Sequence, residues 1–269
     1  MKLQYKLLLS LLTTISAAFA QTSPAIPAET VAAESTIAYN IGIVSQYRYR
    51  GLAQTRGLPA IQGGVDYSNA KGYYLGAWAS QIRWIKDSSS GSTNYSGPIE
   101  LDLYGGYKFE SAGLAYDFGY LRYQYVENNL GSVSGGSYTN ANTDELYGAA
   151  TYGPYTLKYS YAASPLFGYL YSTGSTYLDL TATFDLGDGF TLSPHAGHQL
   201  VKGTSSSYYA GGLSYTDLSL TLAKDLGNGI SLTAAAITTN AKNNANFLSN
   251  STSVNTAKGT LVAGVKYTF

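Results

Sequence analysis

Two pairs of like-charged residues are the first candidates for chemistry in this sequence. Arg48 and Arg50 form a basic pair, and Glu100 and Asp102 form an acidic pair. Residues two apart on a β-strand point to the same face, so each pair would present two like charges to one side of a sheet. If the pairs faced one another across a water-filled passage, the field between them would orient polar solutes. Salt bridges that stiffen a wall, or charges that lie above a membrane, explain the same residues equally well.

Three further charged residues and two histidines complete the candidates. Lys108, Lys158 and Asp179 fall on the polar faces of later segments and rank below the two pairs. His195 and His198 are the only histidines in the sequence, and their spacing of three puts them on opposite faces of a strand. No Ser or Asp forms a recognisable catalytic pattern around them, and no zinc-like spacing exists. The sequence therefore predicts no catalytic residue, no metal and no cofactor.

Apolar and polar residues alternate with a period of two in many segments, which predicts the β-strands that would position these side chains. One face of the first segment is apolar and aromatic as far as Tyr47 and Tyr49, and the opposite face is polar. Around Trp78 both faces look apolar, and between Tyr215 and Leu218 the alternation changes phase, which a bulge would explain. Twelve segments are predicted, near 36–49, 60–69, 72–85, 98–109, 113–126, 143–152, 155–163, 174–185, 190–200, 208–224, 229–240 and 259–269.

The connections between these segments alternate between short and long. Short turns rich in Gly, Asp and Asn alternate with longer loops rich in Ser, Asn and Gly, as in outer-membrane barrels with short periplasmic turns and long external loops. Counted from a periplasmic start, every short connection falls on the periplasmic side. The short connections are 69–72, 110–113, 153–154, 185–189 and 225–229, and the long ones are 86–97, 127–142, 164–173, 201–207 and 241–258.

Barrel geometry indicates which face meets lipid. About eight strands enclose an interior that side chains can fill, so apolar residues pointing into a twelve-stranded barrel would leave voids. With the faces inverted, Ile, Leu and Tyr meet lipid while polar residues line water. We expect an all-β protein, a transmembrane antiparallel up-and-down β-barrel of about twelve strands. A soluble two-sheet sandwich is the alternative.

The ends and the composition fit an exported protein. Residues 1–20 have a basic start, an apolar stretch and a small-x-small site ending at Ala20, as in a signal peptide. Residues 21–35 would form a disordered periplasmic lead-in or a short plug, followed by the barrel over 36–269. There is no Cys, and loss of Lys2 and Lys6 leaves 14 basic against 16 acidic residues, which gives no electrostatic case for nucleic acid. The 27 Tyr residues suit a membrane–water boundary.

Several short motifs in the first third of the mature chain resemble the TorF family of porins, also called the Gcw_chp family of bacterial proteins. The match is good over 37–125, and the later strands follow only the general barrel pattern. The resemblance implies an outer-membrane porin-like barrel and implies nothing about solutes. The motifs are Arg50-Gly51-Leu52 with Gln54-Thr55, the stretch 59–67, Gly72 to Ser80, Glu100 to Tyr107, and Asp117-x-Gly119-Tyr120.

The sequence thus favours a passive pore for small hydrophilic solutes in the outer membrane of a Gram-negative bacterium. The near-neutral lining predicts weak ion selectivity. Expected partners are outer-membrane lipid, the solutes, and the barrel assembly machinery, which would recognise the terminal Phe269. The alternatives are a barrel enzyme, or an adhesin or phage receptor with a closed lumen and apolar loop tips at Trp84, Tyr95 and Phe247.

Overall fold

The computed structural model describes residues 35–88, 94–203, 212–241, 248–249 and 254–269. The expected signal peptide (1–20), nearly all of the lead-in (21–35) and the loop tip at Phe247 lie outside these residues. The described residues contain no helix that is long and apolar enough to cross a membrane.

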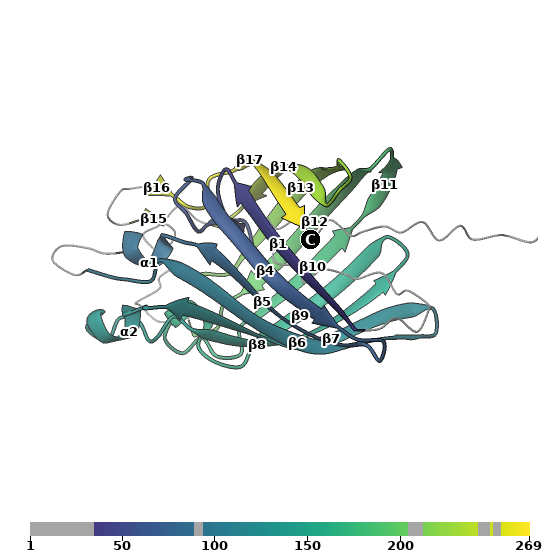
Figure 1. Ribbon diagram of the computed structural model, residues 1–269. Coiled ribbons are helices and arrows are strands. Elements are labelled where there is room, and N and C mark those ends of the chain that lie inside the picture. Colours follow the sequence, from purple (N-terminus) through teal and green to yellow (C-terminus); the bar gives the residue numbers. More distant parts are fainter. Residues whose placement is uncertain (1–34, 89–93, 204–211, 242–247, 250–253) are drawn as a thin grey trace, which may run out of the picture.

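The strands form one closed antiparallel barrel, because the first and last strands pair with each other and every other strand pairs with its neighbours. β10 and β11 follow one another along the same partner, β12, and count as one interrupted strand, so the wall has twelve strands. Figure 1 shows short turns at one end and longer loops with α1 and α2 at the other. The wall strands are β1 (Thr36–Val44), β4 (Ala60–Ser68), β5 (Tyr73–Gln81), β6 (Ile99–Ser111), β7 (Leu114–Val126), β8 (Thr143–Tyr152), β9 (Tyr155–Ala162), β10 (Thr176–Ala182), β11 (Phe184–Gly187), β12 (Phe190–Leu200), β13 (Tyr215–Asp225), β14 (Ile230–Thr239) and β17 (Thr260–Thr268).

Short elements lie at the long-loop end of the barrel. Two of them, β2 and β3, pair with each other between β1 and β4, and β15 pairs with β16 between β14 and β17. They are β2 (Arg48–Tyr49), β3 (Leu52–Ala53), α1 (Trp84–Asp87), α2 (Leu130–Val133), the 3-10 helix η1 (Leu166–Gly168), β15 (Leu248–Ser249) and β16 (Val254–Asn255).

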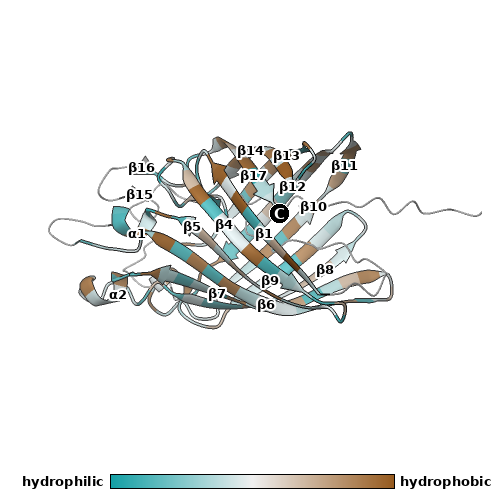
Figure 2. Ribbon diagram, viewed as in Figure 1, coloured by the Kyte–Doolittle hydropathy of each residue, from teal (hydrophilic) through white to brown (hydrophobic). Residues whose placement is uncertain are grey.

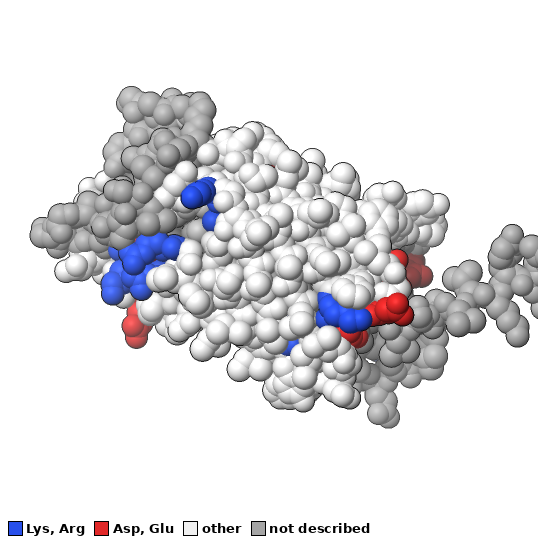
Figure 3. Space-filling model, turned by 90° about the horizontal axis from the view of Figure 1, so that it is seen from above, with Lys and Arg blue, Asp and Glu red and all other residues white. Residues whose placement is uncertain are grey.

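The outer face of the wall is apolar along its middle. Ile41, Leu157 and Leu220 are each about half exposed, although no soluble protein gains from presenting such a belt to water. Figure 2 shows the hydrophobic residues recurring along the strands, and on the face seen in Figure 3 charged residues gather toward the two ends of the barrel. Because closure pairs every wall strand, the barrel can place this belt in hydrocarbon, as a transmembrane β-barrel does.

An aromatic cluster marks the short-turn end of the outer face. The rings of Phe109, Tyr116 and Phe118 stack with centroids 5.2 and 6.2 Å apart. The terminal Phe269 stacks on Tyr267, and its backbone N–H donates to the carbonyl of Tyr39 across the β1–β17 seam. Aromatic residues in these positions suit the boundary between lipid and water.

The predicted strands agree with the observed ones to within two residues except at three ends. The first segment, predicted over 36–49, is wrong beyond Val44, where β1 ends and the chain turns into the barrel. The third segment ends at Gln81 instead of residue 85, and α1 follows it. The tenth begins at Tyr215, and its pairing with β12 is regular, so the predicted bulge is absent.

Candidate functional site

Residues 45–59, here called the inward loop, enter the lumen at the long-loop end. At their centre β2 and β3 pair as a small hairpin whose turn residues, Arg50 and Gly51, have φ angles of 45° and 79°. Two consecutive positive φ angles define the type I′ turn, which matches the twist of a hairpin. A Cβ at Gly51 would lie 2.7 Å from the Cβ of Asp217 on β13. The turn can come this close to the wall because glycine has no side chain.

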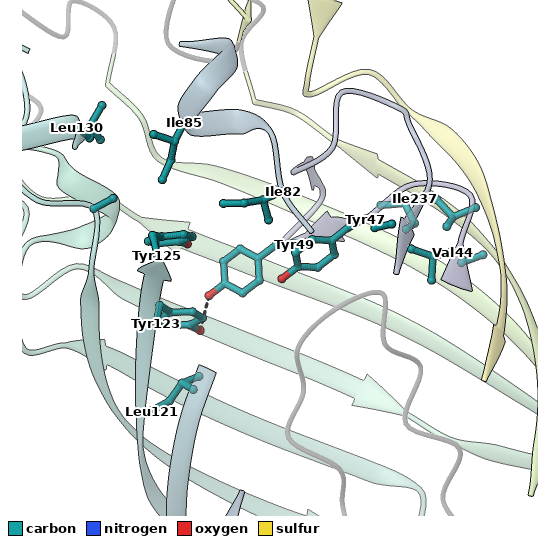
Figure 4. Packing of buried hydrophobic residues seen from close by; sticks show 14 of the residues in the cluster. Val44, Tyr47, Tyr49, Ile82, Ile85, Leu121, Tyr123, Tyr125, Leu130 and Ile237 are labelled. Carbon is teal, nitrogen blue, oxygen red and sulfur yellow. Dashed lines mark hydrogen bonds between the residues drawn. The ribbon is translucent and has the colours of Figure 1, made fainter. Parts of the chain in front are cut away.

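Two tyrosines of the inward loop contact the β5–β7 side of the wall. The Tyr47 hydroxyl donates to Glu100 Oε1 at 2.6 Å, and its ring meets Trp78 edge-on at 5.5 Å. The Tyr49 hydroxyl hydrogen-bonds the Tyr123 hydroxyl at 2.6 Å, which Figure 4 shows. Tyr47 is completely buried, so the sequence-based expectation that Tyr47 and Tyr49 face lipid is wrong. The chain reverses after Val44, and the alternation of β1 no longer determines where these side chains point.

Arg50 connects the same loop to β8, next to β7, and to β10 and β12 further round the wall. Its guanidinium lies 2.8 Å from Glu145 Oε2 on β8 and donates to Gln199 Oε1 on β12 at 2.7 Å. It also lies 4.2 Å above the ring of Tyr177 on β10, within cation–π distance. The inward loop therefore spans the lumen, from Glu100 on β6 to Gln199 on β12.

Arg48 is held by the loop itself and by one neighbouring segment. Its guanidinium donates to Gln46 Oε1 at 2.9 Å, to the Gly51 carbonyl at 2.9 Å and to the Thr256 carbonyl at 3.0 Å. Charge-assisted bonds of this kind fix the conformation of a buried loop. Arg48 thus stabilises the hairpin and does not face Glu100 or Asp102.

Around the inward loop, apolar and aromatic side chains form a packed core inside the barrel. The rings of Tyr49, Tyr123 and Phe167 meet edge-on at 5.3 to 5.6 Å, in arrangements that aromatic quadrupoles favour. Figure 4 shows Ile82 and Ile85 directed into the same cluster. The inward loop and these side chains pack against one another as residues of a protein interior do.

A buried histidine lies between two carboxylates on the far side of the lumen. His195 Nε2 is 3.0 Å from Asp179 Oδ2, and its Nδ1 is 3.5 Å from Asp217 Oδ2. The Tyr177 hydroxyl donates to Asp217 Oδ1 at 2.9 Å. The carboxylates occupy opposite nitrogens of the ring, so they cannot converge on one ion, and no described group of three such residues could hold a metal.

The short-turn half of the lumen is lined by charged and polar side chains. Lys108 Nζ lies 3.9 Å from Asp117 Oδ2 and 4.7 Å from the centre of the Tyr74 ring. Lys158 Nζ lies 3.9 Å from the centre of the Tyr147 ring. The Tyr74 hydroxyl donates to Asp117 Oδ1 at 2.6 Å, so Tyr74 contacts both members of the Lys108–Asp117 pair.

Comparison with known proteins places the chain in a family. The model of a family described as "Bacterial protein of unknown function (Gcw_chp)" matches residues 28–269. The chain belongs to the Gcw_chp family. No curated protein matches the chain.

Solved structures share the fold of this Gcw_chp protein at low sequence identity. The NanC porin has a TM-score of 0.51 at 10% identity, covering 86% of this chain and 99% of NanC. The KdgM porin has a TM-score of 0.49 at 10% identity over 87% of this chain and 99% of KdgM. The COG4313 outer membrane channel from Pseudomonas putida F1 has a TM-score of 0.47 at 13% identity, over 89% of this chain and 96% of that one. At this identity the likeness to NanC extends to the fold alone.

All seven charged candidates of this Gcw_chp protein lie inside the barrel, but their contacts differ from those expected. Arg50 pairs with Glu145, and Glu100 accepts from Tyr47. Reasoning from the sequence missed Glu145 and Asp217, although each precedes an outward Leu and alternation could have found them. The seven are Arg48, Arg50, Glu100, Asp102, Lys108, Lys158 and Asp179.

Proposed function

We propose that this protein is an outer-membrane channel for small hydrophilic solutes, and that the inward loop sets its conductance. An apolar belt outside and charged side chains inside support a barrel that carries water through lipid. The fold shared with the NanC porin agrees with this proposal. Short turns would face the periplasm and long loops the exterior, as is usual for such barrels.

The observation that carries the proposal is the path of the inward loop across the lumen. Tyr47 bonds to Glu100 on β6 and Arg50 to Gln199 on β12, so the loop crosses the lumen and narrows the passage from within. A twelve-stranded wall without this loop would enclose a wide interior. The loop therefore limits the size of solutes that pass, while the wall around it keeps lipid out.

The charges in the lumen favour a weak preference for cations. In the described part of the chain, carboxylates on the inner face outnumber the permanently basic side chains there. Rings of acidic side chains attract cations into a pore. The carboxylates are Asp66, Glu100, Asp102, Asp117, Glu145, Asp179 and Asp217, and the basic side chains are Arg48, Arg50, Lys108, Lys158 and Lys266.

The two ends of the chain complete the proposal. Residues 1–20 act as a signal peptide and residues 21–35 as a periplasmic lead-in. Phe269 lies on the outer face beside the β1–β17 seam, where the assembly machinery could read it while the barrel closes.

The test is to replace the inward loop by a short turn. Val44 and Ala60 are register partners in the β1–β4 pair, so an Asn-Gly turn with one flanking residue on each side can join them without moving the wall. In planar bilayers we expect the full chain to conduct weakly and the shortened variant to conduct several-fold more. Tyr171→Ala changes an aromatic side chain that is 81% exposed, and it serves as the control with unchanged conductance.

Heat-dependent gel mobility establishes that each variant has formed a barrel. If neither folded protein conducts, the channel proposal is wrong. If both conduct equally, the protein is a channel but the inward loop does not limit it.

A further inference from the structure

A pocket lined partly by the inward loop opens at the long-loop end. We call it the outer pocket, and the centres of water-sized molecules can occupy about 120 Å³ of it. Its floor is formed by residues 52–54 of the inward loop, and its walls include Trp84, Tyr125, Phe167 and Tyr215.

We propose that the outer pocket binds a neutral sugar before it passes the inward loop. This proposal rests on the channel function proposed above and names a solute class for it. It depends on three properties of the pocket: its aromatic walls, its balanced charge and its rigid floor.

Aromatic side chains from four separate parts of the chain converge on the outer pocket. Trp84 belongs to α1, Tyr125 to β7, Phe167 to η1 and Tyr215 to β13. Ligand sites combine such apolar walls with a few polar groups that fix orientation. The polar groups here include the amides of Gln54 and Gln199, whose nitrogens donate to the carbonyls of Leu52 and Thr176 and would exchange these bonds for bonds to the ligand. A pyranose has an apolar C–H face for a ring and hydroxyls at its edge for amides, so it matches both.

The charges of the outer pocket leave no strong attraction for an ion. Asp87 Oδ1 lies 3.5 Å from Arg56 Nη1 and 3.6 Å from Arg83 Nη2. A carboxylate that already faces two guanidinium groups is poorly placed to bind a cation. Arg56 is likewise engaged, and the pocket lining has no second arginine or lysine to form the cluster that acidic ligands require. The favoured ligand is therefore uncharged.

The floor of the outer pocket is held rigidly, so little entropy is lost when a ligand binds. The Gln54 carbonyl accepts backbone hydrogen bonds from Arg83 at 2.8 Å and Trp84 at 3.1 Å. Phe167 has φ 49° and ψ 36°, a left-handed conformation that a bulky residue rarely adopts. Its ring nevertheless packs between Tyr49 and Tyr125, with centroids 5.6 and 6.3 Å away. Strained residues of this kind gather at ligand sites.

The pocket is also connected to the contacts that hold the inward loop. Gln199 lines the pocket, and its Oε1 accepts the hydrogen bond from Arg50. A sugar hydroxyl that binds the Gln199 amide would compete with Arg50 for it. Occupation of the pocket would then weaken one contact of the loop that lies below.

The two tryptophans make this proposal testable by fluorescence. Trp78→Phe leaves Trp84, in the pocket wall, as the only tryptophan. We expect maltose to change the Trp84 emission of this variant saturably, and sodium galacturonate and choline chloride to leave it unchanged. Tyr138→Ala removes one pocket ring and should raise the Kd for maltose about tenfold. Tyr171→Ala, outside the pocket lining, should leave the Kd unchanged.

Conductance measured on the same protein separates this proposal from the channel function. We expect maltose added on the long-loop side to block the current of the full chain reversibly. A conducting protein with no fluorescence response to maltose overturns the sugar site and leaves the channel function intact. Equal binding of galacturonate or choline overturns the choice of an uncharged ligand. Saturable maltose binding by a protein that does not conduct supports the site and contradicts the channel.

Discussion

In the long-loop half of the lumen, Tyr47, Tyr123 and Tyr125 are at most 2% exposed, whereas Lys108 and Asp117 in the short-turn half keep 21% and 17% of their side chains exposed. The same twelve strands line both halves. The difference arises from the inward loop, which fills only one of them. One half is packed as a core, and the other keeps a polar surface in contact with water.

This contrast separates two requirements that a pore must meet together. A wide barrel has no internal core, so its wall alone cannot hold a narrow segment of chain in a fixed position inside it. The apolar side chains of the inward loop and its buried Arg50–Glu145 pair fix the loop against the wall. In the short-turn half, Asp117 is satisfied by Lys108 and Tyr74 without such packing. Charge substitutions in the two halves should therefore have different consequences.

The largest effect is expected from Glu145→Ala in the packed half. Removing this carboxylate leaves the Arg50 guanidinium buried beside an apolar side chain, which costs about 3–5 kcal/mol. The free energy of unfolding should fall by that amount in urea titrations of the protein in lipid vesicles. Lys108→Ala, which breaks an ion pair in the short-turn half, should cost at most about 1 kcal/mol.

The double variant Arg50→Ala with Glu145→Ala is the control for this experiment. If the two residues interact directly, it should lose less stability than the sum of the single variants. Equal losses from Glu145→Ala and Lys108→Ala would mean that the two halves of the lumen do not differ in packing.

A smaller loss of stability is expected from a substitution on the outer face. The inward loop does not reach this face, so the contrast between the two halves of the lumen should not apply there. Leu220 lies near mid-height of β13 and is 48% exposed toward the surroundings of the barrel. Leu220→Arg should reduce the free energy of unfolding in lipid by about 2–4 kcal/mol, because the charge enters hydrocarbon. The matched variant Ser219→Arg points into the lumen and should cost clearly less. A larger cost for Ser219→Arg would show that the assigned faces are reversed.

The wall could be predicted from the sequence because the direction of each strand side chain follows from alternation between neighbouring residues. Alternation in β6 and β10 put Glu100, Asp102 and Asp179 on the inner face, and the structure places them there. The positions of Tyr47 and Tyr49 could not be predicted in this way. Their partners, Glu100 and Tyr123, lie 53 and 74 residues further along the chain, and only the folded barrel brings them together.

One sign of the inward loop was nevertheless present in the sequence. Arg50-Gly51 ends in the residue that a type I′ turn prefers, and it directly follows the segment predicted over 36–49. It indicates a hairpin at this point but does not indicate that the chain leaves the wall after Val44. Which way the resulting hairpin folds depends on Glu145 and Gln199, which no local pattern connects to Arg50.

The smallest effect concerns ion selectivity in the open half. Lys108→Gln removes a positive charge beside Asp117, so the preference for cations should rise, and Asp117→Asn should lower it. Reversal potentials under a KCl gradient measure both shifts, which should be modest because other charges line the same wall. Lys71→Gln removes the same charge from an exposed turn outside the lumen and should leave the potential unchanged. If Lys71→Gln and Lys108→Gln shift it equally, the short-turn half does not line the path of the ions, and the contrast between the two halves has no part in permeation.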